Sequence, residues 1–156
     1  MTDRKLILSY KEYTFDELSG EDRQLVEAAV GAMRNAYSPY SNFKVGAAVR
    51  LSDGSIVIGS NQENAAYPSG LCAERTAMFA ASAQHPELDI RSLAVAGGLD
   101  GQLEEVPASP CGACRQVMAQ YQRKAGAPLS VLVVGAECVW KFDRVDDLLP
   151  FIFDSI

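Results

Sequence analysis

The sequence predicts an α/β fold, a three-layer α-β-α sandwich with a mixed, roughly five-stranded sheet. Segments with helical spacing of apolar residues alternate along the chain with runs rich in β-branched residues, in the order helix, two strands, helix, strand, helix and two strands. Such alternation favours a mixed sheet covered by helices on both faces. A chain of 156 residues, 48% of them apolar, also has the size and composition of one domain with a sizeable core.

The first twenty residues are expected to form an extension before a single domain that spans residues 21–156. Within the extension, the stretch Leu6–Phe15 predicts a short strand with Ile7, Ser9 and Lys11 on one face. The alternation of apolar and polar residues in this stretch is poor, and the sequence leaves open whether the extension joins the sheet or wraps around a neighbouring subunit.

The first helix is expected to begin at Ser19. Ser19 followed by Asp22 three residues later is typical of a helix N-cap. The apolar face of this helix consists of residues at helical spacing: Leu25, Val26, Ala29, Val30, Met33 and Tyr37. Pro39 follows the last of them and predicts that the helix has ended by that point.

A hairpin and a second helix follow. The apolar segment Lys44–Leu51 and the β-branched run Ile56–Ile58 flank the turn sequence Ser52–Ser55, which predicts two paired strands. The segment Cys72–Ala83 is rich in helix-forming residues and is followed by Pro86. We therefore expect a second helix over this segment.

The next segments predict a strand, a loop and a third helix. Ser92–Ala96 is a short candidate for a buried strand, and a glycine-rich loop is expected over Gly97–Ala108. Pro110 stands where a first-turn proline belongs, so the third helix is predicted over Cys111–Tyr121.

The last part of the chain predicts two more strands. Leu129–Val134 is the most strand-like run of the sequence, and Cys138–Phe142 is a shorter one. Val145–Leu149 is expected to form a helical turn.

Charge and composition limit the functions to be considered. The formal net charge is −6, and no local cluster of Lys and Arg stands out. Binding to nucleic acid is therefore disfavoured, because it requires basic residues that neutralise phosphates. No segment approaches the roughly 20 apolar residues of a membrane span, and the N-terminus has no secretory signal pattern. We expect a cytoplasmic protein that has no membrane partner.

Two short stretches concentrate the residues that could carry chemistry. Cys72–Arg75 and Pro110–Arg115 each lie at the predicted start of a helix, where unpaired amides favour a thiolate. Cys111 and Cys114 are three residues apart and lie on one helix face, so they can bind one ion together. The four cysteines are too unevenly spaced for a disulfide framework and fit thiols kept reduced for a metal.

Cys72 and Glu74 extend this metal site. Because they are two residues apart, both can reach one ion only if it lies beyond the start of the helix. Three thiolates, from Cys72, Cys111 and Cys114, would leave one tetrahedral position for water, as in a catalytic zinc site. Glu74, an acid without a partner, would then carry protons.

Four ordered motifs surround these residues: Ser38–Ala48, Asn61–Pro68, Leu71–Thr76 and Ser109–Gln116. With these motifs the sequence resembles the cytidine deaminase family, and specifically its small three-cysteine branch. The similarity spans Glu21–Phe153 and leaves the N-terminal extension outside. It implies one Zn²⁺ per chain and a homotetramer that acts on free nucleosides in pyrimidine salvage.

The resemblance also implies a mechanism. Zinc held by the three cysteines acidifies its water, and Glu74 takes the proton, which leaves a hydroxide to attack C4 of cytosine. Glu74 then protonates N3 and delivers a proton to the departing amine, so that uridine or deoxyuridine and ammonia are formed.

Further roles follow from the same resemblance. Three thiolates make the site negative, and Arg75 is expected to withdraw charge by hydrogen bonds to the sulfurs. Asn61 and Glu63 match the pair that holds the ribose 3′-hydroxyl, which would allow both cytidine and deoxycytidine as substrates. The remaining predicted substrate contacts are Phe43 in the pocket wall, the Ala73 backbone, Tyr67, and Phe153 donated by a neighbouring subunit.

Other interpretations of the same residues remain open. A structural zinc site would need a fourth ligand, for which Cys138 and His85 are the spare candidates. A deaminase for another aminated base or for a deoxynucleotide, and a noncatalytic zinc-binding module, are the alternative functions.

Overall fold

The computed structural model describes residues 1–154, which contain three α-helices on one sheet of six strands. The helices are α1 (Gly20–Ala32), α2 (Ala73–Gln84) and α3 (Gly112–Ala125). The strands are β1 (Lys11–Tyr13), β2 (Phe43–Leu51), β3 (Ile56–Ser60), β4 (Ile90–Leu99), β5 (Ser130–Val134) and β6 (Val139–Phe142). Short 3₁₀ helices are η1 (Phe15–Glu17), η2 (Met33–Asn35), η3 (Tyr67–Ser69) and η4 (Val145–Asp147).

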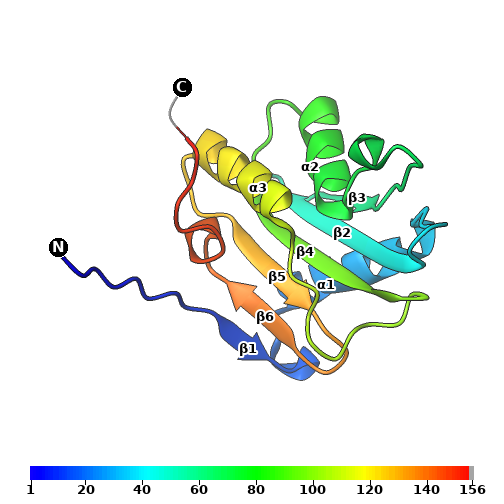
Figure 1. Ribbon diagram of the computed structural model, residues 1–156, viewed down its shortest axis with the longest axis horizontal. Helices are drawn as coiled ribbons and strands as arrows, with labels where there is room; N and C mark the ends of the chain where they lie inside the picture. The colour runs from blue at the N-terminus through cyan, green and yellow to red at the C-terminus, as the bar shows by residue number, and fades with distance from the viewer. Residues whose placement is uncertain (155–156) are drawn as a thin grey trace.

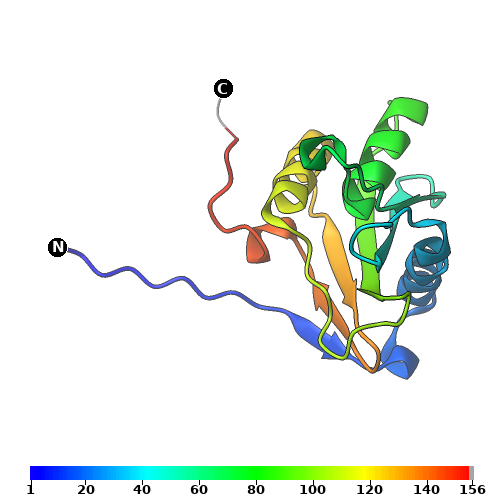
Figure 2. The same ribbon diagram turned by 45° about the vertical axis from the view of Figure 1, so that its right-hand side comes forward.

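The sheet is mixed, as predicted. Its strand order is β1-β6-β5-β4-β2-β3; β4 and β5 are parallel, and all other neighbours are antiparallel. Helix α1 covers one face, while α2 and α3 cover the other (Figures 1 and 2). The three-layer α-β-α fold class is therefore confirmed.

Two buried cores follow from the alternation of side chains along the strands. In β4, Leu93 and Val95 pack into the core under α2 and α3, whereas Ala94 and Ala96 face α1. The two central strands, β4 and β5, are covered on both faces of the sheet. Their side chains are therefore apolar on both sides, and the sequence of each strand shows a continuous apolar run.

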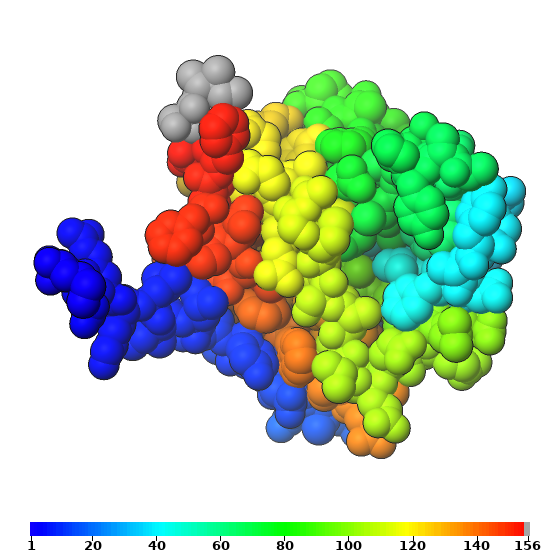
Figure 3. Space-filling view, viewed as in Figure 1, coloured from blue at the N-terminus to red at the C-terminus, as the bar shows by residue number. Residues whose placement is uncertain are grey.

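The sheet has six strands where five were expected, because the N-terminal extension joins its edge. The predicted strand over Leu6–Phe15 is reduced to Lys11–Tyr13, which pairs with β6. Residues 1–10 are exposed and project from the body, which the blue segment shows in Figures 2 and 3. The last two residues of the predicted domain, 155 and 156, lie outside the described residues.

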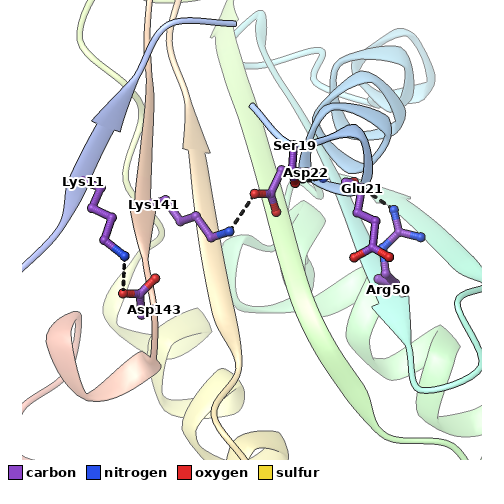
Figure 4. Close-up of polar contacts among 7 residues, drawn as sticks. All are labelled: Lys11, Ser19, Glu21, Asp22, Arg50, Lys141 and Asp143. Carbon is purple, nitrogen blue, oxygen red and sulfur yellow. Dashed lines mark hydrogen bonds and ion pairs between the residues drawn. The ribbon is translucent and has the colours of Figure 1, made fainter. Parts of the chain in front are cut away.

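Ion pairs attach the extension and α1 to the sheet (Figure 4). Lys141 of β6 donates to Asp22 of α1 at 2.6 Å, and Lys11 of β1 donates to Asp143 at 2.8 Å. The predicted cap is confirmed, since Ser19 Oγ accepts a hydrogen bond from the Asp22 amide at 3.2 Å. The first ion pair ties the start of α1 to β6, and the second ties β1 to the residue that follows β6.

One predicted loop was placed wrongly at its start. The expected glycine-rich loop over Gly97–Ala108 begins later, because β4 continues to Leu99 and pairs with β2 along its whole length. Gly97 lies opposite Val45, and a Cβ on Gly97 would stand 3.1 Å from the Phe43 ring. A glycine here leaves space for this ring, so its presence does not indicate a turn.

The third helix also differs slightly from its prediction. Helix α3 extends to Ala125 and ends at Gly126, whose φ of 59° suits a glycine C-cap. Pro110 precedes the N-cap residue Cys111 and therefore lies just outside the helix rather than in its first turn. None of the helices formed by residues 1–154 is long and apolar enough to cross a membrane.

Glycines let two helices approach the hairpin from opposite sides. A Cβ on Gly46 would lie 2.1 Å from the Ala29 carbonyl oxygen of α1. A Cβ on Gly59 would lie 2.7 Å from the Ala73 carbonyl oxygen and 2.4 Å from the Ala77 amide nitrogen, both in α2. The backbone of α2 therefore rests directly on β3, which fixes the position of its N-terminal turn.

Candidate active site

Three cysteines from two helix starts meet at one point. Cys72 is the N-cap residue of α2, Cys111 is the N-cap residue of α3, and Cys114 lies in the first turn of α3. Their three Sγ atoms all lie within 4.8 Å of one another, and Cys72 Sγ is 3.8 Å from Cys111 Sγ. The structure therefore brings together the predicted ligand set, although 39 residues separate the first two cysteines.

The type and the number of ligand atoms in this cluster suit a zinc ion. Thiolates are soft ligands that zinc accepts readily, and three of them leave one tetrahedral position for a water or substrate. Within the part of the chain that the structure describes, neither Cys138 nor His85 belongs to the cluster. The fourth protein ligand that a structural site requires is thus not supplied by either of the two spare candidates.

The pKa values of Cys72 and Cys114 are shifted in opposite directions. The pKa of Cys72 is lowered to about 5, chiefly by a hydrogen bond from Cys114 and further by Arg75 and Cys111. The pKa of Cys114 is raised, because its proton is held in the bond to Cys72 and because the group is buried. Metal binding must displace that proton, so it is coupled to proton release.

Glu74 lies directly beside these thiols. It is the second residue of α2, and only 4% of its surface is exposed. Burial is the main reason that its pKa is raised to about 6, and the neighbouring Cys72 raises it further. A carboxyl group with a pKa close to neutrality can both accept and return a proton.

Arg75 contacts the cluster from the next position of the same turn. Its Nη2 donates a hydrogen bond to Cys72 Sγ at 3.5 Å, and the guanidinium also lies beside Cys114. The expected position of Arg75 next to the sulfurs is therefore present.

Two cavities adjoin at the cluster. One, of about 210 Å³, is lined by Phe43, Val45, Asn61, Cys72, Ala73, Glu74, Val95, Ala108, Ser109 and Cys111. The other, of about 240 Å³, is lined by Tyr40, Asn61, Gln62, Glu63, Asn64, Tyr67, Gly70, Leu71, Cys72 and Arg75. Asn61 and Cys72 line both. We call the first, which contains Glu74 and two of the thiols in its lining, the inner cavity, and the second, which contains Gln62, Glu63 and Asn64, the outer cavity.

Hydrogen bonds to β2 and to the turn before it hold Asn61 and Glu63 in place. Asn61 Oδ1 accepts a hydrogen bond from the Val45 amide at 2.8 Å, and its Nδ2 donates to the Phe43 carbonyl at 2.9 Å. Glu63 accepts hydrogen bonds from residues 40 and 41. These bonds lower the pKa of Glu63, so it is an ionised acceptor at neutral pH.

The remaining predicted contacts are placed less uniformly. Ala73 is buried in the inner cavity wall, whereas Tyr67 is 80% exposed at the rim of the outer cavity. Phe153 is 68% exposed and lines neither cavity. Its backbone instead pairs with the Gln116 side chain, so the C-terminal segment lies against α3, as the red and yellow surfaces show in Figure 3.

The sequence profile of one known family matches more than half of the chain. Residues 19–126 match the profile described as the cytidine and deoxycytidylate deaminase zinc-binding region. The chain belongs to the cytidine and deoxycytidylate deaminase family. The matched profile describes a zinc-binding region, and the three-cysteine cluster supplies suitable ligands for that metal. Zinc is therefore the cofactor.

Individual relatives agree with this membership of the deaminase family. A cytidine deaminase of Halalkalibacterium halodurans is 47% identical over 100 residues, covering 64% of this chain and 71% of the relative. One from Mycobacterium tuberculosis is 42% identical over 125 residues, covering 80% of this chain and 84% of the relative. The crystal structure of a cytidine deaminase from Burkholderia pseudomallei has 41% identity and a TM-score of 0.70, covering 83% of this chain and 97% of that chain.

Some residues of the site were not predicted individually. Val95 and Ala108 line the inner cavity, but nothing in their sequence surroundings distinguishes them from ordinary core or loop residues. Ser109 and Val45 also line it, and each lies inside a deaminase-like motif, which was the available signal.

Proposed function

We propose that this chain catalyses the hydrolytic deamination of cytidine and deoxycytidine to uridine and deoxyuridine, with release of ammonia. The observation that carries the proposal is the position of Glu74. A buried carboxyl group with a pKa of about 6 lies beside three clustered thiols and in the wall of a cavity. The family membership and the similarity to cytidine deaminases support the same reaction.

Glu74 serves as the proton carrier of the reaction. Cys72, Cys111 and Cys114 would hold the zinc ion, which when bound acidifies water and so supplies a nucleophile at neutral pH. Glu74 accepts a proton from the attacking water and passes it to N3 of the cytosine ring. After the C4–O bond has formed, the second water proton goes through Glu74 to the exocyclic amine, and the C4–N bond breaks. The balance is one water consumed and one ammonia released.

The other cavity residues orient the nucleoside and tune the site. Arg75 moderates the negative charge of the three thiolates through its hydrogen bond to Cys72. Phe43 and the Ala73 backbone contact the base in the inner cavity, while Asn61 and Glu63 hold the 3′-hydroxyl of the sugar. Tyr67 lies at the rim beside the sugar. Because a contact with the 3′-hydroxyl does not sense the 2′ position, both nucleosides are substrates.

The setting of the enzyme is part of the proposal. It acts in pyrimidine salvage in the cytoplasm, as a homotetramer, and it binds no nucleic acid. Residues 21–156 form its single domain and residues 1–20 an extension. The exposure of Phe153 away from its own cavity supports the view that a neighbouring subunit uses this ring. The net charge of −6 argues against a polynucleotide substrate.

The decisive experiment is absorbance-monitored turnover of cytidine by the purified protein, with zinc content measured on the same sample. We expect turnover of cytidine and deoxycytidine together with about one zinc per chain. Deoxycytidine monophosphate, guanine and blasticidin serve as competing substrates. If cytidine is turned over no faster than these three, the proposed substrate is wrong.

A further inference from the structure

A tight turn before β2 faces Glu63. The Asn42 amide donates to the Ser38 carbonyl at 3.0 Å, and Asn42 has a φ of 55°, a backbone region that asparagine tolerates better than most residues. The Asn42 carbonyl in turn accepts a hydrogen bond from the Asp100 amide at 2.9 Å. The turn is thus closed on itself and attached to the loop after β4.

This turn directs three donors at one carboxylate. Glu63 Oε2 accepts hydrogen bonds from the Tyr40 amide at 2.9 Å and from the Ser41 amide at 3.3 Å. Glu63 Oε1 accepts a hydrogen bond from the Ser41 hydroxyl. An ionised carboxylate has about four acceptor positions, so three donors hold it in place and leave about one for a ligand in the cavity.

The Ser41 hydroxyl links this carboxylate to the aromatic wall of the inner cavity. While its proton is donated to Glu63, its oxygen accepts a hydrogen bond from the Phe43 amide at 3.0 Å. The Phe43 carbonyl is held in turn by Asn61 Nδ2 at 2.9 Å. One hydroxyl group therefore contacts both Glu63, which lines the outer cavity, and the backbone of Phe43, which is also held by the pairing of β2 with β4.

We infer that Ser41 is a positioning residue for the sugar of the substrate. It lines neither cavity itself; it acts by holding Glu63 so that the free acceptor position of this carboxylate faces the 3′-hydroxyl. The inference rests on the proposed function, which makes Glu63 a contact of that hydroxyl. Without the Ser41 hydroxyl, the Glu63 carboxylate keeps only its two backbone donors and can rotate away from the sugar.

The test compares cytidine with 3′-deoxycytidine in the wild-type protein and in Ser41→Ala. We expect Ser41→Ala to raise the KM for cytidine about tenfold, with kcat changed less than twofold, because a charge-assisted hydrogen bond is lost. Its kcat/KM for 3′-deoxycytidine should remain within about twofold of the wild-type value. The ratio of the two kcat/KM values does not depend on the fraction of folded enzyme, so it remains informative if the variant is unstable.

Two further variants sharpen the test. Ser41→Thr keeps the hydroxyl group and should restore the wild-type ratio. Ser55→Ala is the matched control, because Ser55 also donates its hydroxyl to a carboxylate in a tight turn, that of Asp53 at 2.6 Å, but Asp53, unlike Glu63, lines neither cavity. It should leave the ratio unchanged.

The outcomes separate the inference from the proposed function. An unchanged ratio in Ser41→Ala, or an equal loss on both nucleosides, would overturn the positioning role of Ser41 while leaving cytidine deamination intact. A wild-type protein that does not deaminate cytidine would instead refute the proposed function itself.

Discussion

At the scale of single residues, Glu74 separates metal binding from catalysis. Its carboxyl group is buried beside the thiols, yet the three sulfurs already form a set that can hold the ion. A neutral amide of the same shape would fill the same space but could not shuttle protons. The residue therefore allows the two functions of the site to be measured independently.

We predict that Glu74→Gln retains the fold and about one zinc per chain but loses deamination by several orders of magnitude, since both general base and general acid assistance are removed. Metal analysis and kcat for cytidine on one preparation check this. The exposed helix acid Glu27 gives the control Glu27→Gln, which should behave as wild type. Loss of zinc from Glu74→Gln would show that Glu74 is a ligand.

Arg75 is a second single residue that affects the metal site, through its hydrogen bond to Cys72. Arg75→Ala removes the donor that lies 3.5 Å from Cys72 Sγ and leaves the thiolates more negative. We expect kcat to fall roughly 10- to 100-fold, the usual effect of removing a partner of a metal ligand, with a much smaller change in melting temperature. Arg91→Ala, which removes an ion pair with Asp89 elsewhere on the surface, is the control. Parallel losses of activity and stability would make Arg75 a scaffold residue.

At the scale of elements, the start of α2 is positioned by close backbone packing on β3. Cys72, Glu74 and Arg75 all lie in its first turn or at its cap, so a displacement of this turn moves a ligand, the proton carrier and the charge-withdrawing group together. The contact that prevents such a displacement is that of Gly59 with the backbone of Ala73 and Ala77.

We therefore predict that Gly59→Ala lowers zinc affinity and activity, at a cost of about 1–3 kcal/mol in stability, typical of overpacking. Isothermal titration with zinc and thermal unfolding measure the two effects. Gly31→Ala is the matched control: a Cβ on Gly31 in α1 meets nothing within 4 Å, so alanine should be neutral or stabilising. Unaltered zinc binding in Gly59→Ala would mean that α2 adjusts without disturbing its first turn.

At the scale of the whole molecule, the zinc site joins two helices of the same layer. Cys72 belongs to α2, whereas Cys111 and Cys114 belong to α3, and both helices pack on one face of the sheet. An ion bound by all three thiolates links these helices at their N-terminal ends. Binding to the folded chain alone stabilises it by mass action.

Removal of zinc should lower the melting temperature by about 5–10 °C, which corresponds to a ligand present at about 100 times its dissociation constant in a domain of this size. Differential scanning calorimetry before and after chelation, and again after zinc is restored, measures the shift. Cys138→Ser, which changes the cysteine outside the cluster, should show the same shift, whereas Cys111→Ser should show little. A shift that persists in Cys111→Ser would place the stabilising ion elsewhere.

Much of this molecule was predictable because its signals are local. The Ser19 cap, the turn between β2 and β3 and the cysteines at the starts of α2 and α3 depend on residues a few positions apart. The prediction failed where a distant partner decides the structure. Gly97 lies in a strand because β2 pairs with it. A strand at Lys11 was predicted, but whether the extension joins the sheet was left open, and the edge that β6 provides decided it.

The sequence by itself determined the three cysteine ligands, the neighbouring Glu74 and the alternation of helices and strands. These features follow from motif spacing and from the periodicity of side chains, which are properties of the sequence alone. The tertiary structure decided which groups share a site. Packing of α2 and α3 on one sheet face brings Cys72 within 3.8 Å of Cys111, and the turn before β2 brings Ser41 to Glu63, 22 residues away. These contacts depend on the register of β2 and the seating of the helices on the sheet, which come from the packing of the whole core and not from any single segment.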